Sequence, residues 1–200
     1  MFTQRFSPPV AAAVSACVMA ATAVFADTDE AALYAPDLPS DAIFLRWVDT
    51  DVPLPALGLP HQPVAGQEAY RPLSARHLSG AEPGAFYSVL AGPEGTARLV
   101  EEPARGQKSK VHLILLNASG QPVRLVLADA GHEVIQQTNA FASGGRMVNP
   151  VSARLAVLAD DDSPLGEVAV RLRRGQNVTV LVTDEGVRLI ENQIGDLLEE

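Results

Sequence analysis

The residues best equipped for chemistry in this chain are four histidines and a set of scattered carboxylates. Asp129 and His132 have the Asp-x-x-His spacing of some secreted esterases and acetyltransferases, in which the carboxylate orients an imidazole that activates a serine. The chain lacks the Gly-Asp-Ser segment or Gly-x-Ser-x-Gly elbow that supplies such a serine. We therefore expect Asp129 to be a loop residue, His132 to face solvent, and no catalytic site to be present.

The sequence contains no pattern typical of a metal or cofactor site. Its single cysteine, Cys17, lies in the N-terminal apolar segment, and no two histidines are closely spaced. The run Asp160–Asp162 lacks the glycine and distal glutamate of a helix-loop-helix calcium site, so an acidic turn is the simpler interpretation. No Gly-rich phosphate loop follows a strand and opens a helix. We expect neither a metal nor a cofactor.

Two arginines form the candidate binding feature of the C-terminal part. Arg171 and Arg173 alternate with Val170 and Leu172, so they lie on one face of a predicted strand. Such a stripe could contact carboxylates of an acidic polysaccharide or of a partner, and the alternative is an ordinary solvated strand face. With 24 acidic and 15 basic residues the net charge is −9, which argues against a nucleic-acid partner.

Residues 1–26 have the pattern of a cleaved signal peptide. Arg5 precedes an apolar run that ends in small residues at Val24 and Ala26. A transmembrane anchor is less consistent with this run, which begins at two prolines and barely reaches the length of a span. Lipidation at Cys17 remains an alternative, although the apolar run continues after it. We expect an exported protein located in the periplasm.

Beyond the first 26 residues, alternation of apolar and polar side chains predicts half-buried β-strands. Each of the following stretches places apolar residues on every second position: 43–47, 111–115, 123–127, 153–157, 168–172 and 178–182. Turn signals separate them: Asn117–Pro122, Ser143–Gly145, Asp160–Pro164, Arg174–Gly175 and Asp184–Gly186. No window has a convincing amphipathic helical pattern. The fold class that follows is all-β, built from sandwich or barrel domains.

An internal repeat indicates two domains. Residues 84–101 align with residues 175–191, with Gly, Val-Leu, Glu-Gly, Arg-Leu and Glu in common. Each segment reads as a strand, an acidic-Gly turn and a second strand, and each follows an opening strand at 43–49 or 111–117. The polar stretch 102–109 separates the halves. We predict two tandem small antiparallel β-sandwich domains, at residues 27–106 and 107–200.

The segment just after the signal peptide resembles the opening of the AlgF family of periplasmic alginate O-acetylation proteins. The resemblance rests on Leu33-Tyr34-x-Pro36, on the extended strand that ends at Arg46, and on Val148-Asn149-Pro150 in the second half. The Pro- and Leu-rich stretch 52–60 departs from the family pattern. We include Tyr34 and Arg46, with Arg171 and Arg173, as candidate contacts for a partner or a glycan.

The resemblance implies an accessory, non-catalytic protein made of tandem β-sandwich domains. Its partners would be acetyltransferase-system proteins of the inner membrane and periplasm, with an acidic polysaccharide as a further candidate ligand. Two alternatives stay open from the residues alone. The first is a stand-alone periplasmic carbohydrate-binding or envelope module, and the second is an esterase or acetyltransferase that uses His132 and Asp129.

Overall fold

The computed structural model describes residues 38–54 and 68–198, and nearly all of their regular structure is β-strand. The all-β prediction is confirmed. The strands are β1 (Ala42–Trp47), β2 (Arg71–Ser74), β3 (Phe86–Ala91), β4 (Ala97–Glu101), β5 (Val111–Asn117), β6 (Val123–Leu127), β7 (Glu133–Thr138), β8 (Ala142–Val148), β9 (Ser152–Ala159), β10 (Pro164–Arg171), β11 (Asn177–Thr183) and β12 (Gly186–Glu191). Two short 3-10 turns, η2 (Ala75–His77) and η3 (Pro93–Gly95), complete the elements. No helix in the described ranges has the length and hydrophobicity needed to span a bilayer.

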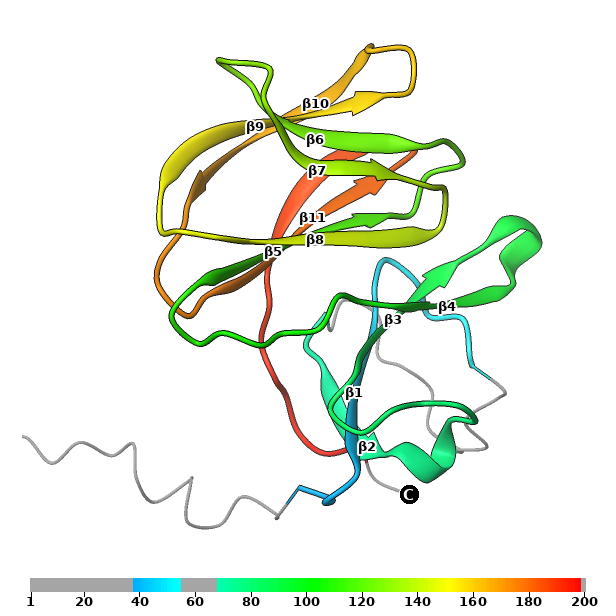
Figure 1. The fold of residues 1–200 in the computed structure, drawn as a ribbon. Helices are drawn as coiled ribbons and strands as arrows, with labels where there is room; N and C mark the ends of the chain where they lie inside the picture. Colours follow the sequence, from blue (N-terminus) through cyan, green and yellow to red (C-terminus); the bar gives the residue numbers. More distant parts are fainter. Residues whose placement is uncertain (1–37, 55–67, 199–200) are drawn as a thin grey trace, which may run out of the picture. The chain divides into compact units, whose positions relative to one another are not determined.

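The C-terminal half is a two-sheet sandwich (Figure 1). One sheet has the order β10-β9-β6-β7 and the other the order β12-β11-β5-β8. Their facing sides form one hydrophobic core from the alternate residues that the sequence pattern predicts. Its fully buried members include Leu115, Leu125, Val157 and Val180. The core explains how this half holds together without disulfides.

Glycines allow the two sheets to approach each other at both edges of the sandwich. A Cβ atom on Gly144 in β8 would lie 2.7 Å from Thr138 Oγ1 and 2.9 Å from Ile135 Cγ2 of β7. At the other edge, a Cβ on Gly166 in β10 would lie 2.9 Å from Val187 Cγ2 of β12. The turn predicted at Ser143–Gly145 is therefore wrong. These residues lie inside β8, where the glycines serve close packing and not chain reversal.

The N-terminal half contributes a single four-stranded sheet, in the order β2-β1-β3-β4, within the described residues. One face of this sheet packs Ile43, Leu45 and Val89 into a second hydrophobic core. The chain's last described segment also belongs to this half. Ile194 forms a parallel bridge with Tyr70, and Leu198 is buried in the same core (Figure 1).

The predicted repeat is present in three dimensions. The hairpins β3–β4 and β11–β12 are both antiparallel, as expected. The opening strand of each half pairs in parallel with the first strand of its hairpin, β1 with β3 and β5 with β11. The expectation of purely antiparallel sheets is therefore wrong for these two pairs. A parallel pair needs a long crossover connection between its two strands. The connection from β1 to β3 contains β2, and the connection from β5 to β11 contains β6–β10.

The two halves meet through equivalent residues of the repeat. A third hydrophobic cluster contains Leu90 from β3 and its counterpart Leu181 from β11. The strand registers make the four other members of the cluster equivalent in two pairs across the halves, Val48 with Leu116 and Val100 with Ile190. This packing buries the second face of β5 and β11, so all of β5 and the five central residues of β11 are buried where alternation predicted half-burial.

The predicted boundary at 106/107 falls between β4 and β5, in the segment that joins the two halves. Residues Pro36–Glu200 form one unit, and the return of residues 192–198 to β2 gives the N-terminal half a C-terminal component. The division into 27–106 and 107–200 stays a prediction. The signal peptide at 1–26 and the candidate contact Tyr34 lie outside the described residues.

Candidate functional site

Arg46, a candidate surface contact, lies in the interior between the two halves. Its side chain is 0% exposed and points from β1 away from the core that contains Leu45. Its guanidinium donates hydrogen bonds to two residues of its own half, Ser88 Oγ at 2.8 Å and Glu102 Oε1 at 2.8 Å. A buried side chain cannot contact a glycan, so the structure corrects this assignment. Arg46 acts in the packing of the halves.

The same guanidinium also reaches across to the C-terminal half. It donates to Asn192 Oδ1 at 2.8 Å and to Thr179 Oγ1 at 3.0 Å, and Thr179 in turn donates to Asn192. One cation thus holds together strands β1, β3 and β11 and the segment that follows β12. Four directed hydrogen bonds fix the guanidinium plane, a geometry that Arg provides and Lys does not.

The negative charge that balances Arg46 comes from Glu102, which follows β4. Its Oε1 also accepts a hydrogen bond from Ser88 at 2.6 Å, and its Oε2 accepts from Tyr70 at 2.6 Å and Arg105 at 2.8 Å. The side chain of Glu102 is 0% exposed and that of Arg105 is 8% exposed. Two cations therefore share one carboxylate, and the cluster carries a net positive charge in the interior.

Aromatic rings complete the cluster. The guanidinium carbon of Arg46 lies 4.4 Å from the centroid of the Tyr70 ring, and that of Arg105 lies 4.5 Å from the same centroid. Arg105 also stacks 3.6 Å above Phe86, which is itself stacked on Phe44 at 4.5 Å. Cation-π contacts of this kind gain strength where water is excluded, and they help to offset the desolvation of both arginines.

Glu102 has a pKa below its ordinary value of 4.5, although its burial alone would raise that pKa. The charges of Arg46 and Arg105, with the hydrogen bonds from Ser88 and Tyr70, outweigh the burial. The pKa of Tyr70 is raised, first by burial and then by the nearby charge of Glu102, so its hydroxyl stays protonated and donates. The Glu102 carboxylate is therefore ionised at neutral pH and accepts hydrogen bonds on both oxygens, whereas Arg105 Nε and Asn192 Nδ2 are buried in the same cluster without a hydrogen-bond partner.

This lowered pKa predicts a loss of stability in acid. A carboxyl whose pKa is lower in the folded than in the unfolded state stabilises the fold above pH 4.5, and the contribution is lost as the pH falls through the folded value. Asp41 and Asp161 have lowered pKa values as well and act in the same direction. We therefore expect urea unfolding to show a stability gap between wild type and Glu102→Gln that narrows between pH 7 and pH 3. A gap of constant size over that range would contradict the assignment.

The cluster uses equivalent positions of the repeat. Ser88 and Thr179 occupy the same register in β3 and β11, and both accept from Arg46. Glu102 N–H donates to Phe86 O, and Asn192 N–H donates to the equivalent Asn177 O. These partners of Arg46 were not predicted from the sequence. The repeat alignment could have indicated them, because it pairs Glu101 with Glu191, which directly precede Glu102 and Asn192. The cluster therefore joins segments of both halves through directed hydrogen bonds.

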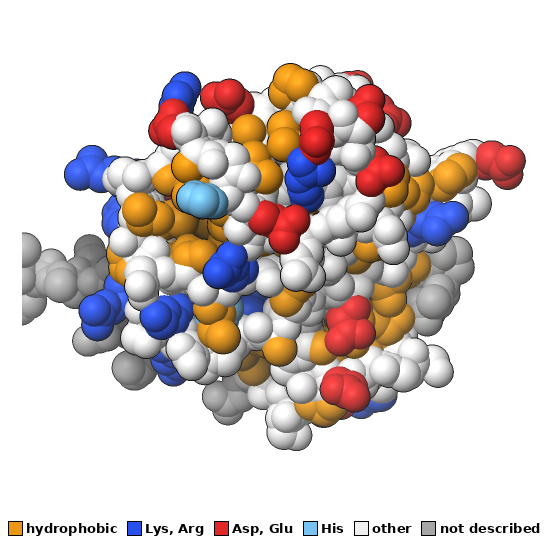
Figure 2. Space-filling model, turned by 45° about the horizontal axis from the view of Figure 1, so that its top comes forward, with side chains coloured by type: hydrophobic (Ala, Val, Ile, Leu, Met, Phe, Trp, Pro, Cys, Tyr) orange, Lys and Arg blue, Asp and Glu red, His pale blue; other side chains and the backbone are white. Residues whose placement is uncertain are grey.

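Arg171 and Arg173, the other two candidate contacts, are exposed and make no ion pair in the described part of the chain. Leu172 between them is buried and lines a hollow of about 480 Å³ at one end of the C-terminal sandwich. Figure 2 shows a face of the molecule on which most Lys and Arg side chains lie toward one side and most Asp and Glu toward the other. The position of the two arginines is compatible with a contact role, which stays a prediction.

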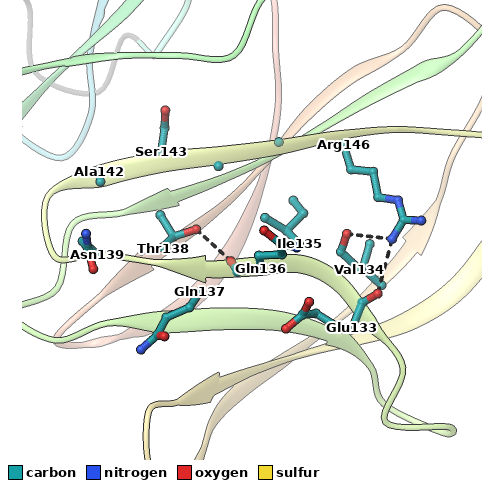
Figure 3. Close-up of a pocket in the computed structure, with 12 residues that line it drawn as sticks. Glu133, Val134, Ile135, Gln136, Gln137, Thr138, Asn139, Ala142, Ser143 and Arg146 are labelled. Carbon is teal, nitrogen blue, oxygen red and sulfur yellow. Dashed lines mark hydrogen bonds between the residues drawn. The ribbon is translucent and has the colours of Figure 1, made fainter.

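A second, more polar groove of about 570 Å³ runs between β7 and β8 (Figure 3). Arg146 bridges it, because its Nη1 donates to the carbonyls of Glu133 at 3.3 Å and Val134 at 3.2 Å. The hydroxyls of Thr138 and Ser143 donate to the carbonyls of Gln136 and Glu101. Among the described residues, both hydroxyls are thus engaged with backbone carbonyls, and the groove presents polar groups that could bind a ligand.

The Asp-x-x-His pair does not assemble. A carboxylate oxygen of Asp129 pairs with Arg154 of β9, and Asp129 makes no hydrogen bond with His132 in the described ranges. His132 is exposed between β6 and β7, as expected for a loop histidine. Asp160–Asp162 form the turn between β9 and β10. No three His, Cys, Asp or Glu side chains within residues 38–54 and 68–198 are grouped to hold a metal ion.

Comparison with known proteins places this architecture in a family. Residues 80–179 match the family model described as "Alginate O-acetyl transferase AlgF". The alginate biosynthesis protein AlgF of Pseudomonas putida is 31% identical over 186 residues, which cover 84% of this chain and 85% of the relative. AlgF of Azotobacter vinelandii is 30% identical, covering 77% and 78%, and AlgF of Pseudomonas aeruginosa is 27% identical, covering 82% and 83%.

A solved structure of the C-terminal domain of AlgF from P. aeruginosa is 27% identical, with a TM-score of 0.37, and covers 42% of this chain and 96% of that domain. The family match thus spans the β3–β4 hairpin, the linker that carries Glu102, and the C-terminal strands up to the middle of β11, and the relatives extend it over most of the chain. The chain belongs to the AlgF family of alginate biosynthesis proteins.

Proposed function

We propose that this chain is a non-catalytic periplasmic adaptor in the O-acetylation of an exported, alginate-like polysaccharide. It would work with a membrane acyltransferase and with periplasmic acetyltransferase partners. The observation that carries the proposal is the family relationship over most of the chain, including 31% identity to a relative named as an alginate biosynthesis protein. The family model's description links the same residues to alginate O-acetylation.

The arrangement of ionisable groups supports an adaptor and not an acetyltransferase. Covalent acyl transfer needs a nucleophile and a base within hydrogen-bonding distance of each other. In the described residues, Asp129 is paired with Arg154, and the Ser143 hydroxyl is bonded to a backbone carbonyl. The buried carboxylate Glu102 is committed to Arg46 and Arg105. The engagement of these described groups in contacts within the chain supports a role in binding.

Deletion of the gene tests the proposal. A strain without the chain is expected to export the polysaccharide in normal amount but with a reduced acetyl content per sugar residue. Acetyl groups are measured on the purified polymer by proton NMR, with total uronic acid as the control for synthesis and export. An unchanged acetyl content in the deletion strain would contradict the proposal.

A stand-alone carbohydrate-binding module is the second candidate, because the polar groove between β7 and β8 could hold a glycan. Affinity electrophoresis of the purified chain in gels containing polyuronate separates the two functions. Retardation of the purified chain by polyuronate, together with unchanged polymer acetylation in the deletion strain, would favour the module.

A further inference from the structure

The hollow at one end of the C-terminal sandwich combines an aliphatic floor with a basic rim. Its lining includes the buried Leu113, Leu155 and Leu172, together with the partly exposed Met147 and Val151, each 48% exposed. Lone exposed apolar residues need no explanation, but two beside an apolar hollow of about 480 Å³ mark an interaction site. We call this feature the sandwich mouth.

The basic rim of the sandwich mouth is built by segments that are hydrogen-bonded to one another. Lys110 and Arg146 line the hollow directly. Leu172 N–H donates to Val151 O at 2.9 Å, and Gly175 N–H donates to Lys110 O at 3.1 Å. The segment that carries the exposed Arg171, Arg173 and Arg174 is thereby held beside the hollow, with Leu172 in the lining and the three arginines outside it.

Within the described residues, the cations in and beside the sandwich mouth stand apart from the ion pairs of the chain. Five arginines of the described residues are held in ion pairs elsewhere: Arg46, Arg105, Arg124, Arg154 and Arg188. None of the described ion pairs includes Lys110, Arg146, Arg171, Arg173 or Arg174. Glu133 is the only carboxylate in the lining of the hollow. In a chain of net charge −9, this concentration of unpaired cations is complementary to an acidic ligand.

The aliphatic side chains that form the floor distinguish between an acidic protein and an acidic polysaccharide as the ligand. Sugar rings pack their C–H faces on flat aromatic rings, and the lining of the sandwich mouth contains no Phe, Tyr or Trp. Branched aliphatic side chains with a methionine at the margin are suited to adaptable contact with apolar protein side chains. An apolar centre within an arginine-rich polar rim is also the usual anatomy of a protein–protein interface.

We propose that the sandwich mouth is the docking site for a partner protein, through a segment that inserts an apolar side chain into the hollow and sets carboxylates over the rim. The identity of that partner as a protein of the acetylation system rests on the proposed function. The carboxylates would steer association and make it sensitive to salt, whereas the inserted side chain would slow dissociation.

Site-specific photocrosslinking in cells tests the docking site. A photoreactive phenylalanine analogue at Val151 or Met147 is expected to give a covalent adduct with a protein of the acetylation system, identified by mass spectrometry. The same analogue at Leu99 of β4, which is 37% exposed, is the matched control and should give no such adduct. Protein adducts of equal yield from Leu99, or none from Val151 and Met147, would overturn the proposal.

Charge reversal supplies a second test that keeps the fold intact. Arg171→Glu/Arg173→Glu is expected to lower the Val151 adduct yield roughly tenfold, as for loss of an energetically dominant contact, and to lower polymer acetylation. Arg98→Glu replaces an exposed arginine of β4, away from the sandwich mouth, and should change neither. Thermal melts confirm that both variants fold.

The outcomes separate this proposal from the one on which it rests. Reduced acetylation in the deletion strain with normal acetylation in Arg171→Glu/Arg173→Glu would retain the adaptor function and reject this surface. Normal acetylation in the deletion strain would reject the adaptor function itself. Binding of an oligouronate to the purified chain that depends on Arg171 and Arg173, without a protein adduct, would assign the surface to polysaccharide and overturn the protein assignment.

Discussion

Glu102→Gln is expected to lower the free energy of unfolding by about 3–5 kcal/mol at neutral pH, the usual result of removing one partner from a buried ion pair. The substitution keeps the shape of the side chain but leaves Arg46 and Arg105 without a counter-charge. Arg46 has no access to water, because its side chain is 0% exposed. The midpoint of urea unfolding, followed by the fluorescence of Trp47, measures the loss.

The neighbouring residue provides the control for this prediction. Glu101 is exposed at the end of β4, and its carboxylate takes part in none of the described ion pairs, so Glu101→Gln should change stability by less than about 0.5 kcal/mol. The double variant Arg46→Met/Glu102→Gln should lose less than the sum of the two single variants, because the buried charges are coupled. Equal midpoints for the Glu101 and Glu102 variants would contradict the structural role of the cluster.

Gly144→Val is expected to destabilise the C-terminal sandwich by about 2–3 kcal/mol, the upper part of the range for overpacking. The new Cβ would lie 2.7 Å from Thr138 Oγ1 and 2.9 Å from Ile135 Cγ2, and Ile135 is part of the sandwich core. The two sheets would have to separate at the edge formed by β7 and β8. Loss of amide hydrogen-exchange protection in these two strands would localise the effect.

Gly120→Val is the matched control, since nothing lies within 4 Å of a Cβ at Gly120 and its backbone is not left-handed. Its substitution should leave the unfolding midpoint nearly unchanged. Equal stability of the Gly144→Val and Gly120→Val variants would show that the contact between β7 and β8 does not require glycine at position 144.

Most of the strands could be predicted from the sequence, because burial of one face imposes alternation. The stretches around Leu45, Leu113, Leu125, Leu155 and Val180 all form strands of the expected cores. The strands β7 and β8 were missed, because Gln136, Gln137, Gly144 and Gly145 carry no apolar alternation. β7 pairs with β6 and β8 pairs with β5, and Gly144 and Gly145 of β8 lie close to Ile135 and Pro103, contacts that no local pattern shows.

The role of Arg46 could not be predicted from its own segment. Its position between Leu45 and Trp47 places it on the face opposite the core, which ordinarily means solvent. It is buried because a second sheet covers that face, and its partners come from four separate segments. The repeat contained part of this information, since equivalent residues of the two halves meet in the third hydrophobic cluster.

The exposed positions of Arg171 and Arg173 agree with the face assigned from alternation. Their proximity to the sandwich mouth depends on the turn at Gly175 and on the contact with Val151, which tertiary structure alone provides. A linear sequence shows where cations can face outward, but not which apolar surface they surround.

The most direct measurement of the adaptor proposal is the acetyl content of polymer from a deletion strain that carries either the wild-type gene or the variant Asp129→Asn, which removes the carboxylate of the Asp-x-x-His pair and lies outside the lining of the sandwich mouth. A protein that brings acetylation partners together without acting on the acetyl group itself should restore acetylation equally well in both forms, well above the empty strain. Equal acetylation in the deletion strain with and without the wild-type gene would contradict that role, and so would failure of a stably folded Asp129→Asn protein to restore acetylation.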